Sequence, residues 1–152
     1  FPGTFDPVTL GHTDIIDRAL PLFDKLVIGI GRNINKKPMF TEKQRLKWLR
    51  EIYKNNPKVE ALAYDGLTVD CCNEVGANFI LRGIRYVNDF EYEKAIADMN
   101  RSIDKKIETI FLTCLPQFTS VASTLVRDVL RNGGDTSQFL PDVVNLSIKK
   151  KK

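Results

Sequence analysis

The residues best suited to chemistry lie at the start of the chain, where residues 3–7 read Gly-Thr-Phe-Asp-Pro and residues 9–12 read Thr-Leu-Gly-His. Small and turn-forming residues end a strand and let the backbone approach a phosphate closely. A helix that begins here directs its unpaired N–H groups and about half a positive charge at that phosphate. His12 then lies at the mouth of the helix, and Gly11 leaves room beside a ligand. The two segments together predict a site for a nucleoside triphosphate.

An isolated Gly-His pair would be explained better by a strand-to-helix turn with a capping aspartate and a surface histidine. The nucleotide interpretation therefore depends on further polar segments. Residues 36–38 (Lys-Lys-Pro), 82–85 (Arg-Gly-Ile-Arg) and 118–127 follow the second, fourth and fifth predicted strands. Ligands of open parallel sheets bind outside the carboxyl ends of the strands, so these segments should converge with His12 at one edge. Such a convergence would suit two phosphorylated substrates.

Strand and helix signals alternate along the whole chain, which predicts a parallel sheet covered by helices. We expect a strand ending near Phe1 and further strands over residues 26–30, 59–64, 79–81 and 107–112, the fourth stopped by Arg82 and Gly83. We expect helices over residues 11–20, 42–53 (after a capping box at 41–44), 67–75, 89–101 and 120–130, and a short one after Pro141. The expected fold is α/β, a single Rossmann-like domain with a doubly wound parallel sheet of about five strands and helices on both faces.

Length and composition suit one domain over residues 1–152, because 152 residues with 43% hydrophobic content can bury a core. The beginning of the first strand is expected to precede Phe1. The net charge of +4 comes from the four lysines at 149–152, and without them 19 basic residues face 19 acidic ones. We expect a solvated basic tail and no nucleic-acid partner. No apolar run is long enough to predict a membrane partner.

The three cysteines give neither a disulfide framework nor a metal-binding spacing, and the adjacent Cys71 and Cys72 are expected to pack as small apolar residues on a helix. A reducing cytoplasm is the expected location. One histidine cannot form a multi-histidine zinc site.

Residues 9–12 match the T/H-x-G-H motif that begins the first helix in the nucleotidyltransferase superfamily. The chain also resembles the bacterial phosphopantetheine adenylyltransferase family from Pro2 to about Val144. The resemblance is most specific in four segments: residues 35–40 (Asn-Lys-Lys-Pro-Met-Phe), 82–85 (Arg-Gly-Ile-Arg), 89–93 (Asp-Phe-Glu-Tyr-Glu) and 99–101 (Met-Asn-Arg).

The resemblance implies reversible transfer of an adenylyl group from ATP to 4′-phosphopantetheine, giving dephospho-coenzyme A and pyrophosphate in coenzyme A biosynthesis. A phosphate oxyanion is already a nucleophile, so direct in-line displacement needs no covalent intermediate, and positioning and electrostatics supply the catalysis. Magnesium is expected to arrive with ATP, without a metal ligand from the protein. The resemblance also implies a homohexamer, arranged as a dimer of trimers.

By the same resemblance His12 stabilises the transition state, and Lys36 and Arg82 are catalytic cations that hold the acceptor phosphate. ATP is expected to contact Thr4, Phe5, His12, Gly83, Ile84, Arg85, Glu93, Phe118, Thr119, Ser120, Val121, Ala122, Ser123 and Thr124. The acceptor is expected to contact Thr4, Lys36, Leu67, Thr68 and Arg82.

Some of these assignments rest on the resemblance alone. From the residues, Glu93 cannot be chosen over Glu91, and a turn lysine such as Lys36 would be interpreted as solvated. Ala122 departs from the family's usual serine and can offer a ligand only its backbone. Arg127 matches the arginine that closes the motif, but a solvated helix arginine is an equally good interpretation.

Three other functions stay open at this point. The chain could be another small nucleotidyltransferase, such as a nicotinate mononucleotide adenylyltransferase or a cytidylyltransferase. It could also be a nucleotide-binding regulatory domain that has lost catalysis. A nucleic-acid-binding module is the weakest alternative, because it rests on the lysine tail.

Overall fold

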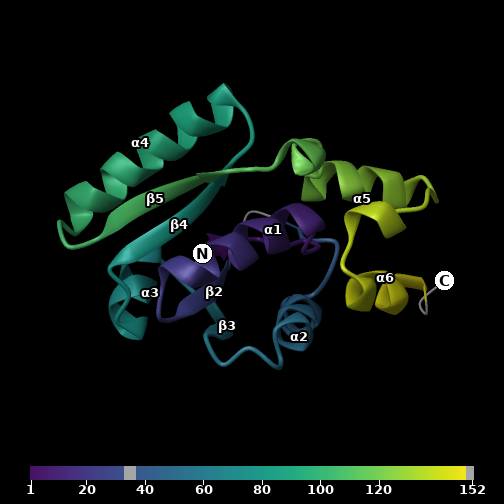
Figure 1. The fold of residues 1–152 in the computed structure, drawn as a ribbon, viewed down its shortest axis with the longest axis horizontal. Helices are drawn as coiled ribbons and strands as arrows, with labels where there is room; N and C mark the ends of the chain where they lie inside the picture. Colours follow the sequence, from purple (N-terminus) through teal and green to yellow (C-terminus); the bar gives the residue numbers. More distant parts are fainter. Residues whose placement is uncertain (33–36, 150–152) are drawn as a thin grey trace.

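The computed structural model describes residues 1–32 and 37–149, which form an α/β fold with parallel strands (Figure 1). One sheet has the order β1-β2-β3 and the other pairs β4 with β5. All of these pairings are parallel. The strands are β1 (Pro2–Gly3), β2 (Leu26–Gly31), β3 (Val59–Tyr64), β4 (Phe79–Ile84) and β5 (Glu108–Thr113).

The two sheets meet where β1 lies beside β4. Their connection is made by a side chain, because Arg82 on β4 donates a hydrogen bond to the carbonyl of Pro2 on β1. The spatial order is therefore 3-2-1-4-5, the order of a doubly wound sheet. Its switch point, where such folds bind ligands, lies between β1 and β4.

Helices cover both faces of the strands. Figure 1 shows α4 along β4 and β5, on the side away from α1; α3 packs beside α4, and α2 packs on β2 and β3. The helices are α1 (Leu10–Ala19), α2 (Glu42–Ile52), α3 (Thr68–Val75), α4 (Val87–Ile103), α5 (Ser123–Arg131) and α6 (Asp142–Lys149).

The main core lies between the strands and the helices α1 and α2. Ile28 and Ile30 of β2 are fully buried there with Ile16 of α1 and Leu49 of α2. Gly29 and Gly31 alternate with these isoleucines and face the ring of Tyr64 on the other side. This alternation is the period of two expected of a strand covered on both faces.

The helix boundaries follow local signals in the sequence. Thr41 caps α2, since its hydroxyl accepts a hydrogen bond from the Gln44 N–H at 3.2 Å. Gly76 ends α3 with a φ of +69°, a left-handed conformation that favours glycine. Cys71 and Cys72 are buried on α3 as predicted. No helix in the described part of the chain has the length and apolarity needed to span a bilayer.

The prediction that Arg82 and Gly83 stop the fourth strand was wrong, because both continue the ladder with β5. Successive side chains of a strand point to opposite faces, so neither residue interrupts the pairing. Arg82 reaches α4, whereas a Cβ on Gly83 would lie only 3.0 Å from the side chain of Ile15 on α1.

The helix predicted from residue 120 begins later, at Ser123. Pro116–Phe118 forms a separate 3₁₀ turn, and Ala122 is extended, with φ −105° and ψ 140°. The first helix likewise ends at Ala19, and the 3₁₀ turn Leu20–Leu22 that follows it contains Pro21. The strand-to-helix connections are otherwise close to those expected.

Candidate active site

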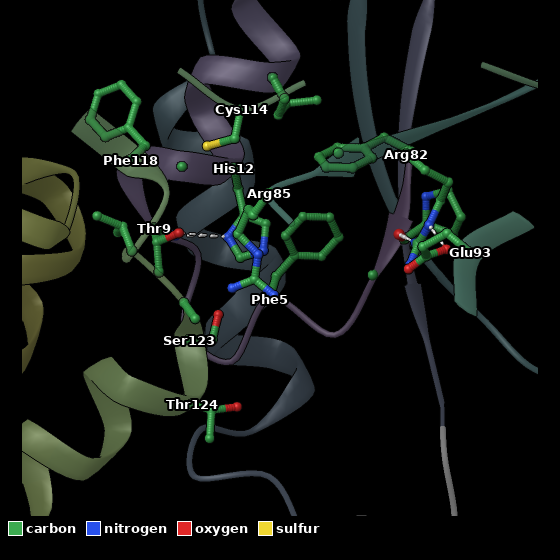
Figure 2. Close-up of a pocket in the computed structure, with 18 residues that line it drawn as sticks. Phe5, Thr9, His12, Arg82, Arg85, Glu93, Cys114, Phe118, Ser123 and Thr124 are labelled. Carbon is green, nitrogen blue, oxygen red and sulfur yellow. Dashed lines mark hydrogen bonds and ion pairs between the residues drawn. The ribbon is translucent and has the colours of Figure 1, made fainter. Parts of the chain in front are cut away.

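A cavity of about 250 Å³ opens at the carboxyl ends of β1 and β4 (Figure 2). Its walls come from β1, the first turn of α1, the end of β4 and the start of α5. Figure 2 shows His12 near the centre, with Phe118, Ser123 and Thr124 on one side and Arg82 with Glu93 on the other. The sequence predicted the convergence of His12 with the segments 82–85 and 118–127, whereas Lys37 and Pro38 of the predicted segment 36–38 do not line this cavity.

The side chain of His12 is held in place by Thr9, the residue that precedes α1. The backbone N–H of Thr9 donates to Nδ1 of His12 at 3.0 Å, and the Thr9 hydroxyl lies 3.0 Å from the same nitrogen. Thr9 itself is fully buried. The imidazole also packs against the ring of Phe5, with centroids 5.0 Å apart. Its orientation is therefore fixed by both hydrogen bonding and packing.

The pKa of His12 is lowered to about 4, first because the imidazole is desolvated and then because Arg85 and Arg82 place positive charge nearby. Each of these effects disfavours the imidazolium. The ring is therefore neutral at physiological pH.

Glycines allow close packing around this ring. A Cβ on Gly3 would lie 2.9 Å from the ring of Phe5. A Cβ on Gly11 would lie 3.2 Å from the carbonyl of Val121, so glycine is needed here for the approach of the loop before α5. Phe5 has a φ of 49°, a left-handed conformation that is uncommon for a non-glycine residue and typical of functional turns.

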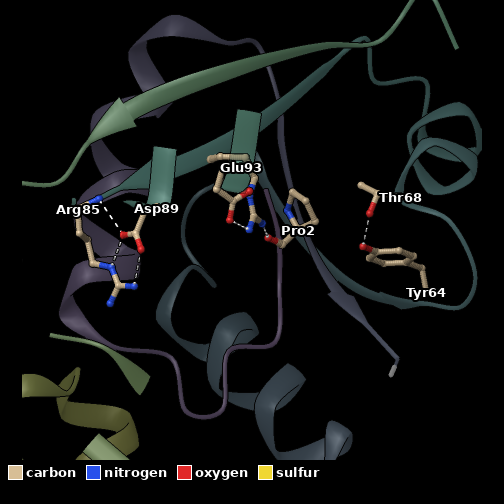
Figure 3. Close-up of polar contacts among 7 residues, drawn as sticks. Pro2, Tyr64, Thr68, Arg85, Asp89 and Glu93 are labelled. Atoms are coloured by element: carbon tan, nitrogen blue, oxygen red, sulfur yellow. Dashed lines mark hydrogen bonds and ion pairs between the residues drawn. The ribbon is translucent and has the colours of Figure 1, made fainter. Parts of the chain in front are cut away.

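Arg82 lines both this cavity and a second one of about 190 Å³. Its guanidinium pairs with both carboxylate oxygens of Glu93 on α4, one of them at 2.7 Å, and with the carbonyl of Pro2 (Figure 3). The second cavity extends from this pair toward Tyr64 and Thr68, whose hydroxyls lie 2.9 Å apart. An anion that enters must share Arg82 with Glu93 or displace the carboxylate.

Arg85 is paired in a similar way, but nearer to solvent. Asp89 accepts hydrogen bonds from the backbone N–H of Arg85 at 3.2 Å and from its Nε at 3.1 Å (Figure 3). The side chain of Arg85 is 35% exposed. Because the pair is at the surface, exchange of its partner should cost little.

The N-terminus of α5 faces the cavity, where free N–H groups favour phosphate. Ala122 lines the cavity without a hydroxyl of its own. The Ser123 hydroxyl donates to the carbonyl of Pro7 at 2.8 Å and so fixes α5 to the turn after β1. Arg127 donates to the carbonyl of Asp6 at 2.6 Å and to the Thr124 hydroxyl at 3.3 Å. Arg127 thus supports the loop and is neither a purely solvated side chain nor a lining residue.

Asp6 is a structural residue that the sequence did not single out. Its carboxylate accepts hydrogen bonds from the N–H groups of Met39 and Phe40, both at 2.9 Å, and lies 3.7 Å from Arg127. Asp6 is 3% exposed. It therefore joins the turn after β1 to the segment before α2 and to α5.

Most of the predicted ATP contacts lie around the cavity: Phe5, His12, Gly83, Arg85, Glu93, Phe118, Val121, Ala122, Ser123 and Thr124 line it. Of the predicted acceptor contacts, Arg82 lines both cavities and Thr68 lines the second. Five other predicted residues lie outside both linings: Thr4, Ile84, Leu67, Thr119 and Ser120. Lys36 is outside the described residues.

Physical reasons account for some of these positions. Ile84 is buried in the sheet, and Leu67 is exposed at the start of α3. Thr4 contributes its carbonyl to the guanidinium of Arg45. Sequence reasoning missed Thr9 and Cys114 in the lining. Thr9 could have been found, because a threonine three residues before His12 has the spacing of a capping box.

Comparison with known proteins identifies the family of the chain. The cytidylyltransferase-like family matches residues 1–129. A phosphopantetheine adenylyltransferase of Flavobacterium psychrophilum is 51% identical over 96% of each chain. That of Bacteroides thetaiotaomicron is 48% identical over 97% of each chain. A third, from Limosilactobacillus reuteri, is 40% identical over 99% of this chain and 87% of its own.

The chain belongs to the phosphopantetheine adenylyltransferase family. This confirms the family and the enzyme class, nucleotidyltransferase, expected from the sequence. The cavity at the switch point, with its donors and positive charges, is the candidate active site for this activity.

The lowered pKa of His12 predicts a pH-dependent loss of stability. Below pH 6.5 the unfolded chain takes up a proton that the folded chain does not bind until the pH approaches 4. The folded state should therefore lose about 2–3 kcal/mol from this group as the pH falls from 6.5 to 4. Urea unfolding of the wild type and of His12→Gln at several pH values measures this loss of stability, since the variant has no imidazole to titrate. Parallel pH dependences in the two proteins would contradict the prediction.

The buried position of Asp6 predicts that its carboxylate stabilises the site. Asp6→Ala should lower the free energy of unfolding by about 2–3 kcal/mol, because two backbone N–H groups lose their acceptor and Arg127 loses the nearby carboxylate charge. Asp6→Asn keeps one acceptor oxygen and should lose less. Chemical denaturation measures both changes, and an Asp6→Ala protein as stable as the wild type would refute this role.

Proposed function

We propose that this chain catalyses reversible transfer of an adenylyl group from ATP to 4′-phosphopantetheine, giving dephospho-coenzyme A and pyrophosphate in coenzyme A biosynthesis. Family membership over nearly the whole chain supports the reaction. The observation that carries the assignment of the site is that His12, Arg85 and the N-terminus of α5 line the same cavity. These are donors and positive charges suited to a triphosphate.

In this proposal the triphosphate lies between α1 and α5, with its α-phosphate at His12. The amides at the start of α5 and the guanidinium of Arg85 contact the other phosphates, and Phe118 to Thr124 enclose them. The acceptor phosphate approaches from the side of Arg82, with Lys36 as a second cation. The acceptor's arm then extends into the second cavity, past Thr68. Attack by the acceptor phosphate opposite the departing pyrophosphate follows from this placement.

Catalysis in this arrangement needs no proton transfer from the nucleophile. The acceptor oxygen is already anionic, so the barrier lies in the approach of two anions and in the charge that develops on the α-phosphate. Arg82 reduces the repulsion between the two anions, because a guanidinium can bind phosphate through two parallel hydrogen bonds and is better suited to this than an ammonium. His12 stabilises the charge on the α-phosphate as a fixed hydrogen-bond donor.

We further propose that Mg²⁺ enters as part of the ATP substrate, that the enzyme works in the cytoplasm, and that it forms a homohexamer.

A surface on α4 supports self-association, because α4 has no buried residue in the single chain. Large exposed apolar side chains on one face of this helix include Tyr92, Met99 and Ile103. An apolar surface of this extent on one helix is typical of an interface.

The reaction is tested by pyrophosphate release with ATP and each of two acceptors. We expect release with 4′-phosphopantetheine and none with nicotinate mononucleotide. His12→Ala should lower kcat by a factor on the order of 10²–10³, as expected for loss of one preorganised donor. Release with nicotinate mononucleotide alone would contradict the acceptor. Binding of ATP without any turnover would instead indicate a regulatory domain.

The assembly is tested by sedimentation equilibrium. The wild type should have six times the mass of one chain, and Met99→Glu should lower that mass by placing a charge in the apolar surface. Lys94→Glu, on the same helix in an exposed ion pair, is a matched control that should leave the mass unchanged. A monomeric wild type would refute the hexamer.

A further inference from the structure

His12 has a second role that is independent of any ligand: it closes the first turn of α1. Thr9 is the residue before the helix, and His12 is the third residue within it. In a capping box the third helical residue, usually Glu or Gln, reaches back and accepts the backbone N–H of the capping residue. Here Nδ1 of His12 takes that position, at 3.0 Å from the Thr9 nitrogen.

This position determines where the imidazole carries its proton. A backbone N–H is always a donor, so Nδ1 must present a lone pair to it. A proton on Nδ1 would set two hydrogens against each other across 3.0 Å, whatever the orientation of the Thr9 hydroxyl. A neutral imidazole has one donor and one acceptor nitrogen, so its hydrogen must be on Nε2.

We propose that the backbone amide of Thr9 locks His12 as the neutral Nε2–H tautomer, so that His12 acts on the substrate as a fixed hydrogen-bond donor and not as an acid or a base. Thr9 is thus a positioning residue for His12. The kinetic part of this proposal rests on the proposed function, whereas the protonation state does not.

The surroundings of the ring favour the same state. The charged and titratable groups among the described residues of the cavity are Arg82 on β4, Arg85 directly after that strand, Glu93 from α4, Cys114 after β5 and the amino group of Phe1, which donates to the carbonyl of Val27. Glu93 is already paired with Arg82, and burial raises the pKa of the Cys114 thiol. The ring therefore faces positive or neutral groups, which oppose its protonation.

The chemistry needs such a group. A phosphate nucleophile brings no proton that a base must remove, whereas the α-phosphate gains charge that a donor can stabilise. A donor whose protonation does not change is ready at every pH at which the substrates bind. Its direction is also set before ATP arrives, because folding of α1 fixes it.

The direct test is ¹⁵N NMR of the substrate-free protein, in which the chain's single histidine gives one set of ring signals. We expect a pyridine-type shift for Nδ1 and a pyrrole-type shift for Nε2, both unchanged from pH 5.5 to 8. A ring that titrates near its ordinary pKa, or that carries its hydrogen on Nδ1, would overturn the proposal. This result is independent of whether the protein transfers an adenylyl group.

Two variants separate the cap from the donor. Gln and Glu at position 12 can both accept the Thr9 N–H, as in an ordinary capping box, but only Gln retains a neutral donor. We expect His12→Gln and His12→Glu to have equal helix content at neutral pH and His12→Gln to have a kcat at least about tenfold higher. Equal rates for two folded variants would overturn the role as donor, while loss of turnover in the wild type would refute only the proposed function.

Two substitutions of Thr9 identify which of its groups fixes the position of the proton on His12. Thr9→Val keeps the backbone N–H and removes the hydroxyl, and Thr9→Ser restores it. We expect the Nε2–H signature in both variants. Conversion of the ring to the Nδ1–H form in Thr9→Val alone would assign the lock to the hydroxyl and overturn the role of the amide.

Discussion

Two polyanions can react on this protein only where it offers donors and positive charge without closing the space between them. The fold meets that constraint at the boundary between β1 and β4, which lie side by side but belong to different hydrogen-bonded sheets. Hydrogen-bonded ladders stop on either side of it, and the guanidinium of Arg82 bridges it to the carbonyl of Pro2. Because α1 and α5 both begin at this edge, their free N–H groups face the same cavity. The other features of the site follow from this separation.

The arginines around the cavity have acidic partners before any ligand binds. Arg82 is paired with Glu93, Arg85 with Asp89, and Arg127 lies against Asp6. Pairing orients each guanidinium and lowers the cost of keeping it partly buried without an anion. Binding of phosphate at Arg82 or Arg85 is then an exchange of one oxyanion for another, which favours release of product as well as binding of substrate. Arg127, which contacts the backbone of Asp6, has a supporting position instead.

Much of this arrangement could be predicted from the sequence, because it depends on local signals. The apolar run at residues 26–30 and Gly76 after α3 set element boundaries directly. The positions of Arg82 and Gly83 could not be predicted, since a charged residue and a glycine resemble a strand end until a partner strand and α4 are known. Asp6 was missed because its partners, Met39 and Phe40, are more than 30 residues away in the chain. The family resemblance located Glu93, which periodicity alone could not distinguish from Glu91.

The central claim is that the cavity between β1 and β4 binds the reacting phosphates, with Nε2 of His12 directed at them. A crystal structure with a non-hydrolysable ATP analogue tests it most directly. We expect the triphosphate between the first turns of α1 and α5, with an oxygen of the α-phosphate within hydrogen-bonding distance of Nε2. A nucleotide bound at the opposite edge of the strands, or one bound in this cavity with its phosphates directed away from His12, would contradict the account.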